Sequence, residues 1–266
     1  MTDGAPAKSC GPARSPVVWI RPGHAGYIGP ELGVDLHSTS VAVLSVGLDG
    51  PFVLETASHG EILTRSAYAP ARAVHRVNTL DKPILLLWSH ASAIEGQMAT
   101  TEGPYGFDHL RERELVEQCR LPDTDPDRIL ALAGAGPPAE IDPRIERVAA
   151  AIRQHPDRVF RAEPIAANLG LSTSHFLRLF VQQYGTTFRR YQQWARVLHA
   201  MRDVAAGHDL TRSATDAGFA TPSHFSETFH RMFGMSATAA LRSGFRFDLE
   251  TTPAPRDSLT TGRTQR

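Results

Sequence analysis

The sequence predicts an α+β protein of two domains, a β-rich N-terminal domain followed by an all-α C-terminal domain. Three observations favour this class. Short apolar runs separated by glycine and proline fill the first half of the 266 residues, as expected for strands joined by turns. Helical periodicity dominates the second half. Formal charge is also uneven, with a net −7 over residues 1–143 and +7 over residues 144–247.

Strand-like segments account for most of the first half. The stretch "VAVLSVGLDGPFVLET" places two apolar runs around the pair Asp49-Gly50, which is a hairpin signal. Further short runs extend to Trp88, and two helices are expected within residues 108–133. Many short strands with turn residues between them are typical of a small barrel or sandwich. The predicted divisions are a flexible arm 1–16, a first domain 17–134, a linker 135–143, a second domain 144–247 and a disordered tail 248–266.

The second half contains a duplicated frame, "SHFLRLFVQQYG" at residues 174–185 and "SHFSETFHRMFG" at residues 223–234. Each copy follows a short helical segment that carries an alanine and, four residues later, a glycine. Close packing in a helix-turn-helix needs a small residue on the first helix and a glycine in the turn. A long amphipathic segment, residues 187–206, joins the two copies. We therefore predict two helix-turn-helix units connected by one long helix.

The two copies share their inward positions and differ at the outward ones. The phenylalanines of each copy lie four residues apart and are expected in the core. The outward positions near the start of each second helix are candidates for DNA contact, because recognition helices read base edges there. They are Thr173, Ser174, Leu177 and Arg178 in the first copy, and Pro222, Ser223, His224, Glu227 and, at the margin, Thr228 in the second, with Ser172 and Thr221 as the preceding N-caps.

Arg178 is the strongest single candidate, because an exposed arginine on a reading helix can donate from both arms to guanine O6 and N7. The competing interpretation is an ordinary surface arginine. The charge of the second half fits a polyanionic partner, since all 14 basic residues of 144–247 are arginine. A metal pair formed by His175 and His224 is disfavoured, because they belong to separate units and no other ligand lies at helical spacing.

Residues 144–245 resemble the DNA-binding domain of AraC/XylS-type transcriptional regulators, in "IAANLGLSTSHFLRLFVQQYGTTFRRY" and "ATDAGFATPSHFSETFHRMFGMS". The resemblance implies double-stranded DNA and RNA polymerase as partners, no cofactor and no enzymatic activity. It does not say whether transcription is activated or repressed. It aligns Ser174, Leu177 and Arg178, and likewise Pro222, Ser223, His224 and Glu227, with base-contacting positions. We also expect Arg189 and Arg190, near the start of the long helix, to contact phosphates.

The second unit departs from the family pattern at two positions. Ser213 stands where the family usually has isoleucine, and Ala237 stands where it usually has proline. Loss of a buried isoleucine side chain weakens packing by about one to a few kcal/mol. Glu227 also replaces what is often arginine, and a carboxylate repels phosphate unless it accepts from cytosine N4. We therefore expect the first unit to supply most of the DNA affinity.

The first half is similar, more weakly, to cupin barrels, which serve many such regulators as sensor domains. His75 lies five residues after Pro70 and three before Asn78, as in the second cupin motif. The first motif needs a His-x-His pair and a glutamate, but this chain has His37 and Thr39. Two histidines form an incomplete metal set. We expect no metal, and an effector cavity with His37 and His75 as its polar groups; alternatively, His75 is a hydrogen-bonded core residue.

Other features limit the remaining classes. No apolar run reaches the length of a signal peptide or a membrane span, so a cytoplasmic location without membrane contact is expected. Cys10 and Cys119 are too few for a disulfide framework. The two helices of the first domain could form a homodimer or cover the barrel. Two alternatives to a regulator stay open: a metal-dependent cupin enzyme with an appended helical domain, and a sensor or anti-regulator that no longer binds DNA.

Overall fold

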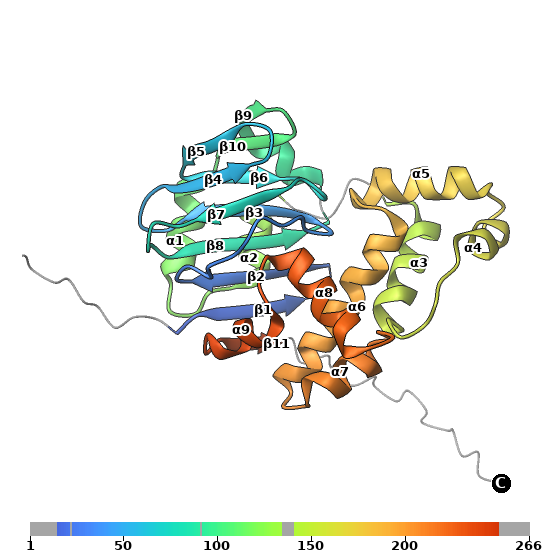
Figure 1. Ribbon diagram of the computed structural model, residues 1–266. Coiled ribbons are helices and arrows are strands. Elements are labelled where there is room, and N and C mark those ends of the chain that lie inside the picture. The colour runs from blue at the N-terminus through green and yellow to red at the C-terminus, as the bar shows by residue number, and fades with distance from the viewer. Residues whose placement is uncertain (1–14, 22, 91, 135–140, 250–266) are drawn as a thin grey trace, which may run out of the picture.

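The structure, a computed structural model, describes residues 15–21, 23–90, 92–134 and 141–249 (Figure 1). Most of the predicted arm, linker and tail, with Cys10, lies outside the described residues. A β-rich body formed by the first half and a helical body formed by the second lie side by side (Figure 1). The predicted α+β class is confirmed.

The β-rich body contains two sheets. Its strands are β1 (Val17–Arg21), β2 (His24–Gly29), β3 (Ala42–Gly47), β4 (Phe52–Thr56), β5 (Gly60–Thr64), β6 (Ser66–Ala69), β7 (His75–Asn78), β8 (Ile84–Ser89), β9 (Met98–Glu102) and β10 (Tyr105–His109), with a 3₁₀ helix at Ser92–Gln97. Seven of them and β11 (Arg246–Leu249) form an eight-stranded sheet in the order β11-β1-β2-β8-β3-β6-β10-β9. The other three pair in the order β5-β4-β7.

The turn at Asp49-Gly50 does not close a hairpin. β3 pairs with β6 and β8 in the large sheet, whereas β4 pairs with β5 and β7 in the small one. The chain therefore crosses from one sheet to the other at this turn. The alternating burial of β4 explains the crossing, because Phe52 and Leu54 point inward and complete the core between the sheets.

Two helices cover the outer face of the large sheet. They are α1 (Glu112–Arg120) and α2 (Pro126–Leu132), within the predicted region. Leu115, Val116 and Ile129 pack on strand residues such as Leu44 and Leu85. Both faces of β3 are buried as a result. The sequence left open whether these helices form a homodimer or cover the strands. In the structure they cover the large sheet.

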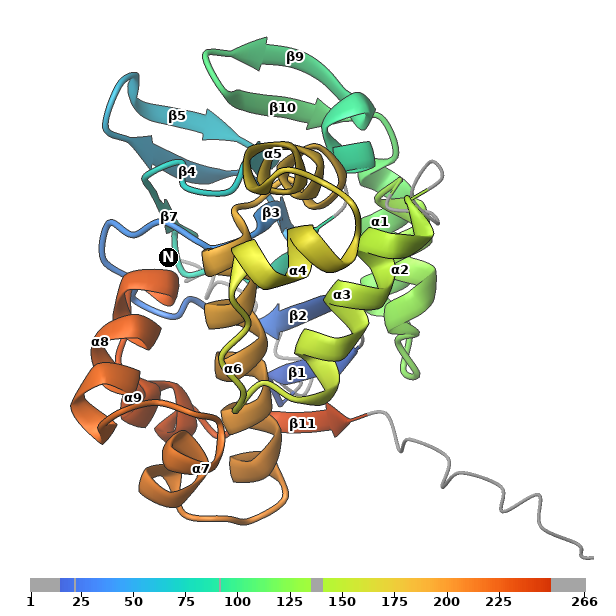
Figure 2. The ribbon, with the colours of Figure 1, turned by 90° about the vertical axis from the view of Figure 1, so that its right-hand side faces the viewer.

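The helical body follows the predicted duplication. Its helices are α3 (Pro143–Gln154), α4 (Ala162–Asn168), α5 (Thr173–Tyr184), α6 (Phe188–Ala205), α7 (Leu210–Asp216), α8 (Pro222–Phe233) and α9 (Ala237–Arg242). α4 and α5 form the first unit, α7 and α8 the second, and α6 runs between them (Figure 2). Both reading helices, α5 and α8, end at a glycine in the left-handed conformation, Gly185 at φ 64° and Gly234 at φ 68°.

The two units have different cores. In the first, Phe176, Phe180 and Tyr184 pack against α3 and α6 in a separate cluster. In the second, Phe225 and Phe229 belong to the cluster that also fills the inside of the β-rich body. The β-rich body, whose two sheets together we call the barrel, therefore shares one core with the second unit.

Strand β11 is a feature that the sequence did not predict. It pairs in parallel with β1, with Val17 opposite Arg246, at the place where the predicted second domain ends and the tail begins. Arg21 donates to Asp248 at 2.9 Å. The end of the described chain is thus a strand of the large sheet, because it finds an unpaired edge there.

Candidate nucleic-acid interface and ligand cavity

The first reading helix presents its predicted contact residues to solvent. Ser172 is the N-cap of α5 and accepts from the backbone N–H of His175 at 3.2 Å. Ser174, Leu177 and Arg178 are exposed on the following turns. Within the described chain, Arg178 makes no side-chain hydrogen bond or ion pair, so its guanidinium donors are available to a ligand.

The second reading helix exposes Pro222 and some, but not all, of its other predicted residues. Thr221 caps α8 and accepts from the N–H of His224 at 3.0 Å, and Ser223 and Glu227 are exposed. The ring of His224 packs edge-on against Phe219 with centroids 5.4 Å apart, so this side chain is half-buried. The expectation for Thr228 is wrong. Its side chain is fully buried, because position 228 lies on the same helix face as Phe225.

Ser213 occupies a buried position on α7, as its place in the family pattern indicated. Its side chain is 1% exposed, and among the described residues its hydroxyl has no hydrogen-bond partner. A buried hydroxyl without a partner destabilises the folded state. Ala237 is also buried, at the start of α9, where Ser236 provides the N-cap.

Arg189 and Arg190 lie away from the starts of both reading helices. They are in the first turn of α6, which follows the end of α5. Arg190 is half-buried, and its Nη1 donates to the backbone oxygen of Thr39 in the β-rich body at 3.1 Å. Burial, and then the charges of Arg72 and Arg231, lower the pKa of Arg190. In this arrangement Arg190 contacts the barrel.

The loop between β2 and β3 holds the end of α8. The N–H of Asp35 donates to the oxygen of Gly234 at 2.8 Å, and the N–H of Ser38 donates to the oxygen of Arg231 at 3.2 Å. The Asp35 carboxylate also lies 3.4 Å from Nε2 of His230. A Cβ at position 234 would lie 2.5 Å from the Asp35 oxygen, so only glycine permits this approach. The loop between β2 and β3 therefore clamps the second unit, which means that its hydrogen bonds hold the end of α8 against the barrel.

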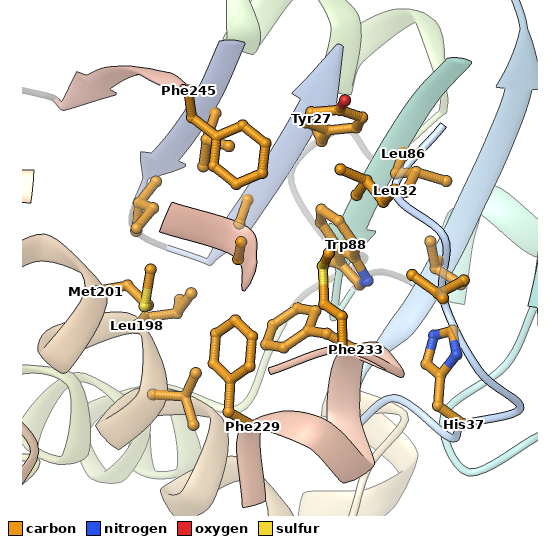
Figure 3. Close-up of a pocket in the computed structure, with 18 of the residues that line it drawn as sticks. Tyr27, Leu32, His37, Leu86, Trp88, Leu198, Met201, Phe229, Phe233 and Phe245 are labelled. Atoms are coloured by element: carbon orange, nitrogen blue, oxygen red, sulfur yellow. The ribbon is translucent and has the colours of Figure 1, made fainter. Parts of the chain in front are cut away.

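An apolar cavity of about 100 Å³ lies between the large sheet and the helices α6, α8 and α9. Figure 3 shows aromatic side chains from the strands and from α8 around it, with His37 at its edge. The rings and the thioethers in its wall are those of Tyr27, Trp88, Trp194, Met201, Phe229, Phe233, Met235, Phe245 and Phe247. Because the wall comes from both bodies, we call it the junction cavity.

His37 and His75 both line the junction cavity, where the structure brings them together. Their ring centroids are 4.8 Å apart, and their backbones are bridged by the N–H of His37 donating to the oxygen of His75 at 3.0 Å. Nδ1 of each ring lies near a backbone oxygen, that of Asp35 at 2.9 Å and that of Ala73 at 3.0 Å. A carbonyl only accepts, so each Nδ1 carries the proton and each Nε2 is an acceptor.

Both histidines are neutral at pH 7. Burial, and then the neighbouring His37, lowers the pKa of His75 to about 4. Burial is also the main cause that lowers the pKa of His37. In the described part of the chain, no group of three or more His, Cys, Asp or Glu side chains could hold a metal ion. The same part of the chain contains no helix long and apolar enough to cross a membrane.

Sequence reasoning missed most of the cavity wall. Phe229 was expected in a core, but nothing local indicates that Trp88, Phe233 and Trp194 meet there, since they lie on three elements far apart in the sequence.

Residues 165–243 match the family model of a helix-turn-helix domain. An apo variant of ToxT from Vibrio cholerae strain SCE256 has a TM-score of 0.58 and 12% identity, covering 84% of this chain and 98% of that one. ToxT from Vibrio cholerae O395 bound to (E)-4-(8-methylnaphthalen-1-yl)but-3-enoic acid has a TM-score of 0.53 and 11% identity, covering 83% and 99%. Wild-type ToxT from strain SCE256 bound to an unsaturated fatty acid has a TM-score of 0.54 and 10% identity, covering 84% and 95%.

At such low identity these structures show a shared fold. The matched helix-turn-helix domain identifies a DNA-binding transcriptional regulator, and the shared fold adds a β-rich N-terminal domain. Residues 165–243 carry a helix-turn-helix domain of the AraC type, as the resemblance implied.

Proposed function

We propose that this regulator responds to a small, uncharged and largely apolar molecule bound in the junction cavity. The observation that carries the proposal is the origin of the cavity wall. Phe229 and Phe233 come from α8, the second reading helix, whereas Tyr27 and Trp88 come from the large sheet. A molecule between them changes how α8 packs on the barrel. It can therefore shift the equilibrium between positions of the reading helix that bind DNA differently.

The cavity wall favours a ligand without charge. None of the described residues that line it is Lys, Arg, Asp or Glu, and His37 and His75 are neutral at pH 7 because burial lowers the pKa of each. A carboxylate transferred into such a wall would lose its hydration without gaining a counter-charge. The Nε2 atoms of the two histidines can accept a hydrogen bond, so a hydroxyl on the ligand would be recognised.

The volume of the cavity limits the ligand to at most about one ring. It is about 100 Å³, below the roughly 150 Å³ of an apolar cavity that binds benzene. The aromatic wall offers edge-to-face and stacked contacts to such a ring. The ligands named for ToxT are both acids, a fatty acid and a naphthalenyl butenoic acid. We therefore propose that this protein, with the same fold, selects a smaller and neutral molecule.

On the DNA side, we propose that α5 and α8 enter successive major grooves, about 34 Å apart. The 18 residues of α6 span about 27 Å and hold the two units apart. Arg178, Ser174 and Leu177 would meet bases in one groove, and Ser223, His224 and Glu227 in the other. The N-caps Ser172 and Thr221 place free backbone N–H groups near phosphates. RNA polymerase and a second copy of the chain are further partners that we infer from the resemblance alone.

The proposed ligand class is tested by calorimetric titration of the full-length protein at pH 7.5 with benzyl alcohol and, separately, with benzoate. We expect saturable binding of benzyl alcohol and binding of benzoate that is at least about tenfold weaker, because of the uncompensated charge. Equal or tighter binding of benzoate would contradict an uncharged ligand, and binding of neither compound would contradict a ligand of this size.

A matched pair of variants on α9 locates the site. Ala240→Leu adds three carbons to a side chain that lines the cavity, whereas Ala239→Leu makes the same change at an exposed neighbour. We expect the first variant to lose benzyl alcohol binding and the second to keep it. The effect of the ligand on DNA affinity is then measured by mobility shift, with and without benzyl alcohol, in wild type and in both variants.

A further inference from the structure

Four arginines gather in a second cleft, on the other side of the loop that clamps α8. This cleft has a volume of about 470 Å³. Arg72 comes from the turn before β7, Arg189 and Arg190 from the first turn of α6, and Arg231 from the last turn of α8. Ser38, Ser40, Thr187 and Gln193 supply polar groups around them. We call this site the arginine cleft.

We propose that the arginine cleft binds a small oxyanion of about two negative charges, of the phosphate type, which bridges the barrel and the DNA-binding domain. This ligand is distinct from the neutral molecule proposed for the junction cavity. The proposal does not depend on whether that molecule exists.

The positive charge of the cleft has no counterpart in the described chain. None of its four arginines forms an ion pair there, whereas arginines elsewhere do, such as Arg21 with Asp248 at 2.9 Å and Arg153 with Glu146 at 2.6 Å. Asp35, on the clamping loop, lies against His230 instead. Like charges held close together repel one another. An anion in the cleft would remove this cost, so the cleft is more favourable when occupied.

The backbone fixes two of the arginines in place. The oxygen of Thr39 accepts from the backbone N–H of Arg72 at 3.0 Å and from Nη1 of Arg190 at 3.1 Å. Arg72 has a φ of 74°, a left-handed conformation that costs free energy in a residue with a side chain. The burial of Arg190 and then the charges of Arg72 and Arg231, which line the same cleft, lower the pKa of Arg190.

The chemistry of the cleft suits an oxyanion. The guanidinium group offers paired N–H donors that match two oxygens of a phosphate group. The start of an 18-residue helix, α6, adds partial positive charge from its backbone N–H groups. The hydroxyl of Ser38 and the amide of Gln193 are further donors in the wall.

The position of the cleft argues against DNA as its ligand. The residues that we propose to contact DNA bases lie at the starts of α5 and α8, whereas the cleft lies at the end of α8 and beyond the end of α5. Each of these helices has 12 residues, a length of about 18 Å.

The test is calorimetric titration of the full-length protein with inorganic phosphate, at constant ionic strength maintained with sodium chloride. We expect saturable binding to the wild type. Arg72→Gln and Arg231→Gln each remove one cleft charge from an exposed side chain, and we expect each to weaken phosphate binding by about tenfold. The matched control is Arg242→Gln, an exposed arginine of α9 outside the cleft, which should change the affinity less than about twofold.

Two results would overturn the proposal. One is the absence of saturable phosphate binding, or an equal loss in the Arg242→Gln protein, which would indicate a general attraction of anions to a positive surface. The other is a mobility shift, without phosphate, in which Arg72→Gln weakens DNA binding as much as Arg178→Ala does. That result would make the cleft part of the DNA interface. Neither the phosphate titration nor the mobility shift uses the apolar ligand, so both outcomes are independent of the junction cavity.

Discussion

The two helix-turn-helix units use the same frame but belong to different structural environments. In the first, the rings of Phe176 and Phe180 pack on α3 and α6, and the unit has a core of its own. In the second, Phe225 and Phe229 share a core with the inside of the barrel. The frame therefore determines the caps and the inward positions, while its surroundings determine what those positions pack against. This difference makes the second unit the one whose packing responds directly to the barrel.

A polar network adds to the independence of the first unit. Arg153 donates to Glu146 at 2.6 Å and to the hydroxyl of Tyr191 at 2.7 Å, and Glu146 accepts from the hydroxyl of Tyr184. The network joins α3, α5 and α6. From the barrel, His90 packs on these rings, with centroids 4.7 Å from Tyr191. The first unit thus touches the barrel at its surface, whereas the second contributes to the interior.

The largest effect on stability is expected from truncating an aromatic ring in the shared core. Phe229→Ala should destabilise the protein by about 3–5 kcal/mol, since it leaves a void in a core common to α8 and the sheet. Phe180→Ala should cost a similar amount in the separate core. Hydrogen exchange distinguishes the two: we expect faster exchange in β2 and β8 for Phe229→Ala, and in α3 and α5 for Phe180→Ala. Equal acceleration of β2 and β8 in both variants would show that the cores are not separate.

DNA affinity provides the second test of the comparison. Arg178→Ala removes an exposed donor from the first reading face and should weaken binding by about 1–3 kcal/mol, with relaxed preference at one base pair. Glu227→Ala removes a carboxylate from the second face and should leave the affinity unchanged or raise it, because it also removes repulsion from phosphate. Mobility shifts at two salt concentrations measure both. A larger loss for the glutamate variant would reverse the assignment of the stronger unit.

The shared core should also be sensitive to acid. His75 has its pKa lowered to about 4 by burial and by the neighbouring His37, whereas the unfolded chain has the ordinary value of 6.5. Below pH 6.5 the unfolded state binds the proton and the folded state does not, so stability is lost as the pH falls from about 6.5 to about 4. At pH 5 the loss from this residue is about 2 kcal/mol.

The His75→Gln variant isolates that contribution, because glutamine does not titrate. His24, with a pKa lowered to about 4, and His90, with a pKa lowered to about 3, contribute in the same direction, so the variant keeps part of the pH dependence. We expect the difference in unfolding free energy between pH 7 and pH 5, measured by urea denaturation, to be smaller in the variant by about 2 kcal/mol. An unchanged difference would mean that His75 becomes protonated in the folded protein.

Local signals in the sequence were sufficient to predict the helices of both units. Ser172 and Thr221 cap them, and Gly185 and Gly234 end them, as the frame indicated. Long-range pairing was not predictable in this way. β11 joins β1 although about 230 residues separate them, as the separation of 227 between Arg21 and Asp248 illustrates. Pairing of this kind depends on which edge is unpaired once the sheet has formed.

The candidate sites also divide into residues that local sequence signals identify and residues that only long-range packing brings together. Outward positions such as Ser174 and Arg178 could be identified from helical spacing alone, because they need no partner within the chain. The arginine cleft brings Arg72 next to Arg231, and the junction cavity brings Trp88 next to Phe233 with ring centroids 5.5 Å apart. No spacing rule connects residues on different elements. The prediction that Thr228 faces outward was wrong for a related reason. Thr228 lies at the border of the outward face, and packing against neighbouring residues buries it.

The smallest expected effect concerns the buried hydroxyl of the second unit. Among the described residues the Ser213 hydroxyl has no partner, so Ser213→Ala should stabilise the protein by about 1 kcal/mol, because it removes an unsatisfied polar group at the cost of little volume. Ser226→Ala is the control: that exposed hydroxyl donates to the oxygen of Pro222 at 3.0 Å, and its loss should be neutral or slightly destabilising. Thermal unfolding of both variants measures the difference. If Ser213→Ala instead lowers the melting temperature, the hydroxyl contributes to the packing of α7. The lower DNA affinity expected of the second unit would then have to come from its reading face alone.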